Sequence, residues 1–174
     1  QSPHYLQVDP RVGHNLPRLG SGQDVTVNVV DGRDSNIMGT RSGAAMSSAV
    51  ITVEAHDLVP KLQAQAEIAL TRMGFEPTTQ PTDGRPSVTL TLTELSYRQE
   101  NAQPLIDRAR LVARMRAEVV NAGNTYTGIY TAKREQTYAV KPDRETNARM
   151  VTDLLSSALD RAFSDPKVSN LLAR

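Results

Sequence analysis

The sequence contains no cysteine and no tryptophan, and only two phenylalanines and five tyrosines among its 174 residues. Without cysteine, the chain has no disulfide bond, no thiol nucleophile and no Cys-ligated zinc. The scarcity of aromatic side chains argues against the stacking platforms that bind single-stranded nucleic acids. A formal net charge of +1 gives no electrostatic reason to expect a nucleic-acid partner either. The core must therefore consist mainly of Val, Leu, Ala and Met.

No apolar run approaches the length of a membrane-spanning helix. The chain length fits one domain that buries a core without disulfides or metal. The first 24 residues are set apart by spaced prolines and glycines: Pro3, Pro10, Gly13, Pro17, Gly20 and Gly22. Proline at such intervals prevents helix and favours extended chain. We therefore predict an extended N-terminal arm or linker over residues 1–24 and a single domain over residues 25–174.

Alternation of apolar and polar residues predicts most of the strands. The clearest case is Ser87–Thr93, beyond which the phase slips and predicts a β-bulge near Glu94. A long hairpin is predicted over residues 105–138, with Asn121–Asn124 as a turn whose loop has two or three residues. Further strands are predicted at residues 24–31 and 49–54, and loops at residues 32–48 and 76–87.

Two segments show the three- and four-residue apolar spacing of amphipathic helices. The first has Asp57 as its predicted N-cap, Pro60 in its first turn and Gly74 as its C-terminal stop. The second begins at Asp143 and ends before Pro166, because the residue before proline disfavours helix. One sheet face is enough to cover both apolar stripes. The predicted fold class is α+β: a mainly antiparallel β-sheet with two amphipathic helices packed on one face.

The order and spacing of these segments resemble the YajG family of bacterial lipoproteins. The resemblance rests on Asp24–Arg33, on Leu70–Phe75 at the end of the first helix, on Val88–Leu95, on the hairpin turn and on the last helix. It implies a signal peptide, a lipidated N-terminal cysteine with palmitate in its anchor, and a periplasmic domain tethered to the outer membrane. The chain opens with Gln1 instead of Met, and we expect the lipobox cysteine shortly before it. The resemblance brings no established catalytic residue.

Patterns that indicate metal binding or nucleophilic catalysis are scarce. The three histidines are too scattered for a metal triad. They are His4, His14 and His56. The sequence has neither a Gly-x-Ser-x-Gly elbow nor a Gly-rich phosphate loop. We therefore expect no metal site, no catalytic set and no cofactor.

Two acidic residues, Asp31 and Asp34, follow a predicted strand end, where functional loops often lie. Paired carboxylates can carry out acid–base chemistry. Aspartate also binds the backbone of its own turn, and Gly32 permits unusual dihedral angles there. We favour the structural interpretation, in which Arg33 pairs with a carboxylate and holds the loop.

Arginines form the one unusual cluster. Four of them lie at alternate positions of a predicted strand, on the face opposite its apolar face, and Val112 interrupts their row. They are Arg108, Arg110, Arg114 and Arg116. Two interpretations stay open. In the first, the row is a solvated outer face whose charge is balanced by nearby acids or which protects a sheet edge. In the second, it is a surface for an anionic partner. Arginine suits the second role because it binds carboxylate and phosphate in a bidentate manner.

The function that the sequence favours is that of a non-enzymatic periplasmic domain of a membrane-anchored lipoprotein with a binding or scaffolding role in the cell envelope. The expected partners are an envelope protein, peptidoglycan or lipid headgroups, and not nucleic acid. Two alternatives stay open: a cell-wall-active hydrolase or transferase that uses Asp31 or Asp34, and a component of a self-assembling homo-oligomer. A deep pocket with convergent titratable groups would indicate the enzyme, and a flat Arg-lined or apolar patch would indicate the scaffold.

Overall fold

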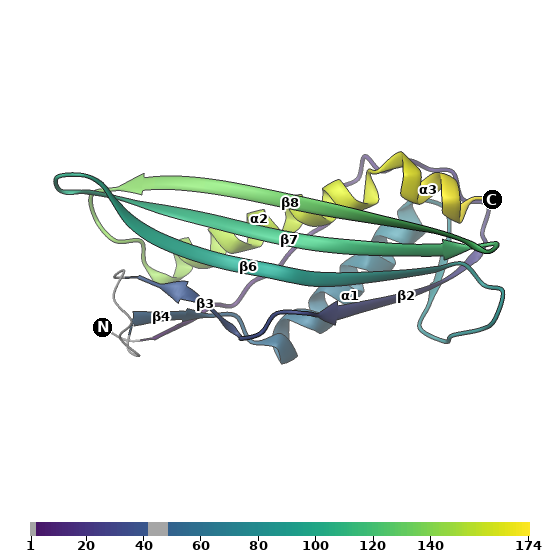
Figure 1. Ribbon diagram of the computed structural model, residues 1–174, viewed down its shortest axis with the longest axis horizontal. Helices are drawn as coiled ribbons and strands as arrows, with labels where there is room; N and C mark the ends of the chain where they lie inside the picture. Colours follow the sequence, from purple (N-terminus) through teal and green to yellow (C-terminus); the bar gives the residue numbers. More distant parts are fainter. Residues whose placement is uncertain (1–2, 42–48) are drawn as a thin grey trace.

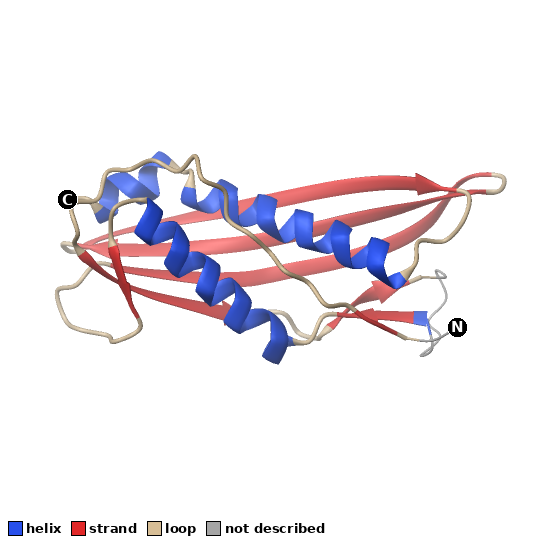
Figure 2. Ribbon diagram, turned by 180° about the vertical axis from the view of Figure 1, so that it is seen from behind, coloured by secondary structure: helices blue, strands red, loops and turns tan. Residues whose placement is uncertain are grey.

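The computed structural model of the protein describes residues 3–41 and 49–174 and shows an α+β fold with the helices on one face of a long sheet (Figures 1 and 2). The strands are β1 (His4–Tyr5), β2 (Asp24–Asp31), β3 (Ile37–Thr40), β4 (Val50–Thr52), β5 (Glu76–Thr78), β6 (Ser87–Gln103), β7 (Ile106–Asn121) and β8 (Asn124–Tyr138). The helices are α1 (Ala55–Arg72), α2 (Arg144–Phe163) and α3 (Pro166–Leu172).

The sheet is mixed, which corrects the prediction of a mainly antiparallel one. The pairs β3–β4, β6–β7 and β7–β8 are antiparallel, whereas β1–β4, β2–β5, β2–β6 and β3–β6 are parallel. The parallel pairs of β5 and β6 arise because the chain crosses over through α1 and returns in the direction of β2 and β3, whereas β1 and β4 both precede α1. Alternation within one strand reveals its buried face but not the direction of its neighbours, which is why the sequence did not predict these pairs.

Two short strands lie in segments that were predicted as loops. β5 contains Pro77 and lies at the sheet edge beside β2, where proline is tolerated. In β3, a Cβ on Gly39 would lie 1.9 Å from the carbonyl oxygen of Tyr97 in β6, so only glycine fits between these strands. Glycine and proline therefore mark a close strand contact and an edge strand here. Residues 42–48 of the predicted loop lie outside the described residues.

The central strand β6 changes its neighbour along its length. Its first part, Ser87–Leu92, pairs with β2, and farther on Tyr97 pairs with Gly39 of β3. Its register with β7 shifts between Leu92 and Glu94, which confirms the predicted bulge. The link between β2 and β3 lies at this break, where the Gly32 N–H donates to the carbonyl oxygen of Leu92 (2.9 Å).

The predicted hairpin over residues 105–138 is confirmed as β7 and β8. Asn121 pairs with Asn124, so the loop has two residues. These are Ala122 and Gly123, with φ of 52° and 77°. Two successive left-handed residues are typical of the hairpin turn whose twist matches the flanking strands.

α1 and α2 cover one face of the sheet, as predicted, and the short helix α3 extends this layer (Figure 2). α1 packs mainly on β2, and α2 on β7 and β8. Leu155 and Leu159 of α2 are fully buried. The predicted cap of this helix is confirmed, since the Asp143 side chain accepts a hydrogen bond from the Thr146 N–H (2.8 Å). None of the helices described here is long and apolar enough to cross a membrane.

The start of α1 differs from the prediction. Its N-cap is Glu54, which makes no side-chain cap bond, and Asp57 lies in the first turn. The Asn36 side chain from the β2–β3 link takes the role of the cap, because its Oδ1 accepts a hydrogen bond from the Ala55 N–H (3.1 Å). The predicted stop is confirmed, since Gly74 follows the helix with φ of 93°.

Residues 3–23 cross the two long helices as a mostly extended chain (Figure 2). Three apolar side chains of this arm are buried: Leu6, Val8 and Val12. Helix side chains bind its backbone. Gln65 Oε1 accepts from the Val12 N–H (2.9 Å), and Asp160 Oδ1 accepts from the Gly13 N–H (2.6 Å). The described part of the arm is thus packed onto the helical layer of the domain.

Candidate functional site

The four arginines of β7 lie on the face of the sheet that none of the described helices covers. The alternate residues of β7 are buried beneath the helices, whereas the arginines are exposed or half-buried. This arrangement follows from the period of two in a strand. The row therefore lies on an open outer face.

Three of the four arginines form ion pairs with acids on neighbouring strands. Arg114 pairs with Glu94, and Glu100 Oε1 lies 3.3 Å from Arg108 Nε and 2.8 Å from Arg110 Nε. Arg110 also lies 2.8 Å from Glu135. Glu94 and Glu100 were not identified from the sequence, because the bulge hides the register of β6 beyond Leu92. Ion pairs of this exposure contribute only about 0–1 kcal/mol each.

Arg116 differs from the rest of the row: it forms no ion pair with another residue in the described ranges, and it is exposed. The strand register places it in a line across four strands. This line, here called the Arg116 patch, consists of Val30, Thr91, Arg116 and Ile129. Val30 and Ile129 are 45% and 57% exposed. Ile129 is the apolar neighbour of Arg116 in this line, and a guanidinium group beside an apolar side chain can use its donors and its flat surface together.

An open depression of about 330 Å³ lies farther along the same strands, and no residue of the Arg116 patch lines it. Charges of both signs line it, including Glu94, Arg98, Arg110, Lys133 and Glu135. Because the acids already neutralise part of the cationic charge, the depression offers a mixed polar surface. The Arg116 patch is the less compensated part of the face.

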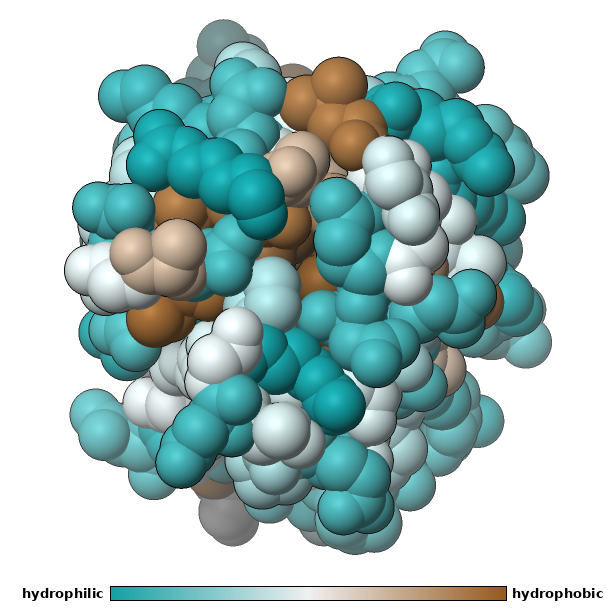
Figure 3. Space-filling view, turned by 90° about the vertical axis from the view of Figure 1, so that its right-hand side faces the viewer, coloured by the Kyte–Doolittle hydropathy of each residue, from teal (hydrophilic) through white to brown (hydrophobic). Residues whose placement is uncertain are grey.

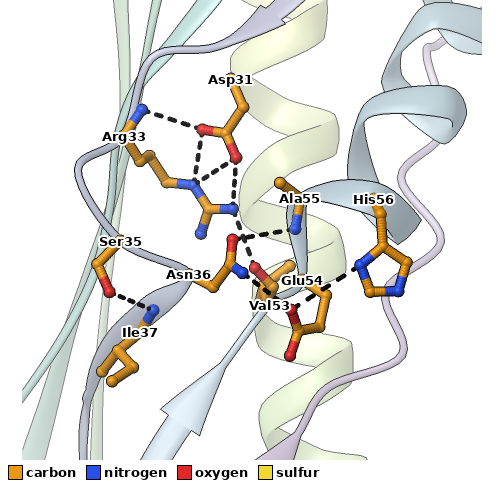
Figure 4. A network of polar contacts seen from close by, with 9 residues as sticks. All are labelled: Asp31, Arg33, Ser35, Asn36, Ile37, Val53, Glu54, Ala55 and His56. Atoms are coloured by element: carbon orange, nitrogen blue, oxygen red, sulfur yellow. Dashed lines mark hydrogen bonds and ion pairs between the residues drawn. The ribbon is translucent and has the colours of Figure 1, made fainter.

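The predicted pair between Arg33 and a carboxylate is confirmed, with Asp31 as the partner (Figure 4). Arg33 Nε donates to Asp31 Oδ1 (3.0 Å), and Nη2 donates to Oδ2 (2.8 Å) and to the carbonyl oxygen of Val53 (2.9 Å). The two side chains are only 4% and 12% exposed. Burial acts to raise the pKa of Asp31, but the hydrogen bonds and charge of Arg33 outweigh it and lower this pKa.

The same network joins the β2–β3 link to the start of α1. Asn36 Nδ2 donates to Glu54 Oε2 (2.8 Å), and His56 Nδ1 lies 3.9 Å from the same carboxylate (Figure 4). Asp31 and Arg33 point toward each other, and Asn36 points toward Glu54 and the Ala55 N–H. Asp34, the other candidate carboxylate, is exposed. The arrangement fixes a loop and does not assemble a nucleophile with a base.

A second polar cluster was not predicted. The hydroxyl groups of Tyr126 and Tyr130 both donate to Asp165 Oδ2, at 2.8 and 2.7 Å, and Asp165 also caps α3. Burial opposes ionisation of Asp165, but the tyrosine hydrogen bonds prevail and lower its pKa. Burial and this carboxylate raise the pKa of Tyr130. The cluster holds α3 against β8. The only sequence signal for it is that the two tyrosines lie on the same face of a predicted strand.

The histidines do not come together. Within residues 3–41 and 49–174, no group of three or more His, Asp or Glu side chains is placed to hold a metal ion. His4 lies 3.4 Å from the Asn147 amide, and burial together with nearby arginines lowers its pKa. His56 lies beside Glu54 and Asp57 at the start of α1.

Comparison with known proteins places these features in a family. The family model described as an uncharacterized lipoprotein matches residues 10–173. A Xanthomonas campestris crystal structure of the DUF330 type is similar at 10% identity, with a TM-score of 0.62 and coverage of 98% of this chain and 97% of that one. An uncharacterized protein is similar at 11% identity, with a TM-score of 0.53 and coverage of 94% and 99%.

A minor lipoprotein from Acinetobacter baumannii is similar at 14% identity, with a TM-score of 0.40 and coverage of 85% of this chain and 91% of that one. Comparison with curated protein sequences gave no match. Because the identities are so low, the similarity to the Xanthomonas protein and to the uncharacterized protein shows a shared fold alone.

Proposed function

The chain belongs to the family of uncharacterized lipoproteins of the YajG type, and we propose that it is the periplasmic domain of an outer-membrane lipoprotein with a binding or scaffolding role in the envelope. In this proposal a signal peptide directs export, and a lipobox cysteine shortly before Gln1 carries the palmitate-containing anchor. The family membership supports a lipid-anchored envelope protein. Its binding role is argued from the outer face of the sheet.

The observation that carries the binding role is the exposed Arg116 patch on the open outer face. Arg116 has no carboxylate partner among the described residues. Thr91 and Ile129 lie on either side of it, and Val30 lies one strand beyond Thr91. An anionic group of an envelope protein, of peptidoglycan or of a lipid headgroup would gain bidentate hydrogen bonds there without first displacing an internal ion pair. The other three arginines would add positive electrostatic potential, but their ion pairs with Glu94, Glu100 and Glu135 neutralise part of it.

A hydrolase or transferase based on Asp31 is the weaker proposal. Both oxygens of Asp31 are bound by Arg33, and the lowered pKa of this carboxylate disfavours proton uptake. A homo-oligomer that uses the same outer face is a stronger second candidate. The exposed Val30 and Ile129 favour it, because apolar side chains on a flat sheet face suit a second copy of the chain.

Replacing both Arg114 and Arg116 by Gln is expected to reduce binding to isolated envelope fragments several-fold, with most of the loss produced by Arg116→Gln alone. Wild-type binding should weaken as salt rises, because exposed charges are screened beyond about 10 Å at 0.1 M. Cosedimentation measures both effects. The fold should lose at most about 1 kcal/mol, since the substituted groups are exposed.

The matched control is the pair Arg161→Gln and Arg174→Gln, which removes the same charge from exposed positions in and after the helices. It should bind as the wild type does. Equal binding by the Arg114/Arg116 variant and by the wild type would contradict the binding role of the outer face.

A further inference from the structure

One end of the domain carries the two most exposed large apolar side chains among the described residues. Leu105, in the turn between β6 and β7, is 94% exposed, and Val140, which follows β8, is 83% exposed. Tyr138 at the end of β8 pairs with Asp107, so Val140 continues the chain at the same end as Leu105. The turn and the strand ends next to it, Asn101–Ile106, have no charged residue. We call Leu105, Val140 and this turn the apolar tip.

Neither folding nor packing explains Leu105. Its φ of 66° lies in the left-handed region, where Gly, Asn and Asp are the favoured residues. A leucine in this conformation carries backbone strain, and its side chain gains almost no burial in the isolated domain. A surface that takes up this side chain from outside would account for both features.

The apolar tip lies at the end from which the chain upstream of the domain departs. His4 pairs with Ile51, Ile51 with Gly39, and Gly39 with Tyr97, so His4 lies level with Tyr97 of β6. β1 runs opposite to β6, so the chain enters β1 from the side on which the tip lies. From Tyr97 to Gln103 the tip projects roughly 20 Å farther, at about 3.3 Å per residue. Figure 1 shows β4, the partner of β1, toward the same end as the β6–β7 turn.

The other end of the domain is different. It carries the C-terminus, and hydrophilic side chains cover most of it, with apolar ones visible in a few places (Figures 1 and 3). The two ends are therefore unlike in chemistry as well as in their distance from the upstream chain.

We propose that the apolar tip contacts the surface of the bilayer to which the chain is anchored, with Leu105 and Val140 in the region between headgroups and acyl chains. This inference rests on the proposed function, because it requires an anchor upstream of the described residues. Lys141, exposed beside Val140, suits the lipid phosphates. Two apolar side chains add little binding by themselves. Their effect is to orient a domain that the anchor already holds, with its long axis directed away from the membrane.

The test uses the full chain with a cysteine added before Gln1 and coupled to a maleimide lipid in vesicles of phosphatidylethanolamine and phosphatidylglycerol. Because the sequence has no tryptophan, Leu105→Trp introduces a single fluorescent reporter at the tip. Leu19→Trp is the control at the other end, next to Gly20, which binds the carbonyl oxygen of Met73 at the end of α1. On coupling, Leu105→Trp should shift its emission to the blue and be quenched by brominated lipids, and Leu19→Trp should do neither.

A second variant separates lipid contact from any disturbance of the turn. Val140→Trp should be quenched in the same way, and the addition of Leu105→Asn, which suits a positive φ, should reduce that quenching while the thermal melt stays unchanged or rises. Emission from coupled Leu105→Trp that matches the uncoupled protein would overturn the proposal. Since the lipid is supplied chemically, that result is independent of whether cells lipidate the native protein, and the absence of native lipidation would instead refute the proposed function.

Discussion

Replacing Arg33 by alanine is expected to lower the free energy of unfolding by about 3–5 kcal/mol, because it leaves the Asp31 carboxylate buried without its partner. The substitution also removes the hydrogen bond from Nη2 to the carbonyl oxygen of Val53, which ties the β2–β3 link to the end of β4. Chemical denaturation of the purified domain measures the effect. A loss below about 1 kcal/mol, the range of exposed pairs, would show that the pair is not structural.

The chain contains its own control for this measurement. Arg11 pairs with Asp9 at the same sequence spacing and the same 2.8 Å distance, but the two side chains are 68% and 65% exposed. Arg11→Ala should therefore cost only about 0–1 kcal/mol. Comparison of the two variants isolates the contribution of burial from that of the ion pair.

The effect of Arg33→Ala should also depend on pH. Despite the opposing effect of burial, Arg33 lowers the pKa of Asp31 in the folded protein. The contribution of the pair is thus present above the ordinary aspartate pKa of 3.8 and is lost as the pH falls through the lower folded value. The difference between the wild type and Arg33→Ala should shrink in acid, and a difference that grows below pH 3.8 would refute this assignment.

Leu159→Ala is expected to destabilise the domain by about 2–5 kcal/mol, since it leaves a cavity where α2 packs on the sheet. Leu159 is fully buried, as its place in the apolar stripe predicts. Ile68→Ala in α1 is the matched control, because Ile68 is 37% exposed and should cost less. Equal thermal melts of Leu159→Ala and the wild type would exclude this helix face from the core.

The sequence predicted those parts of the fold that are determined by local periodicity. The stripe of α2, the alternation in Ser87–Leu92 and the turn at Ala122-Gly123 each depend on residues close together in the chain. The parallel pairing of β2 with β6 depends on contacts across α1, and strand periodicity carries no information about it. β3 was missed because Gly39, which reads as a loop residue, is required by contact with Tyr97.

The candidate site was predictable to a similar extent. The alternation of residues along the strand was enough to place the arginine row on one face of β7. The position of Asp31 in a turn beside Gly32 and Arg33 indicated the ion pair between Asp31 and Arg33. Glu94 and Glu100, the β6 acids that neutralise part of the row, were not predictable, since the bulge after Leu92 determines which β6 residues face Arg108 and Arg114. Val30, Thr91 and Ile129 come into line with Arg116 only through the register of four strands. Leu105 was missed because a lone exposed leucine has no sequence signature.

The most direct test of the central claim, that the open outer face is the binding surface, is site-specific photo-crosslinking of the anchored protein in the envelope. A photoreactive residue at Ile129 samples the Arg116 patch, and one at Ile68 samples the exposed side of α1 on the helical layer. The account predicts a discrete crosslinked product from position 129 that weakens in the Arg116→Gln background, and none from position 68. A product from position 68 with none from position 129 would contradict it.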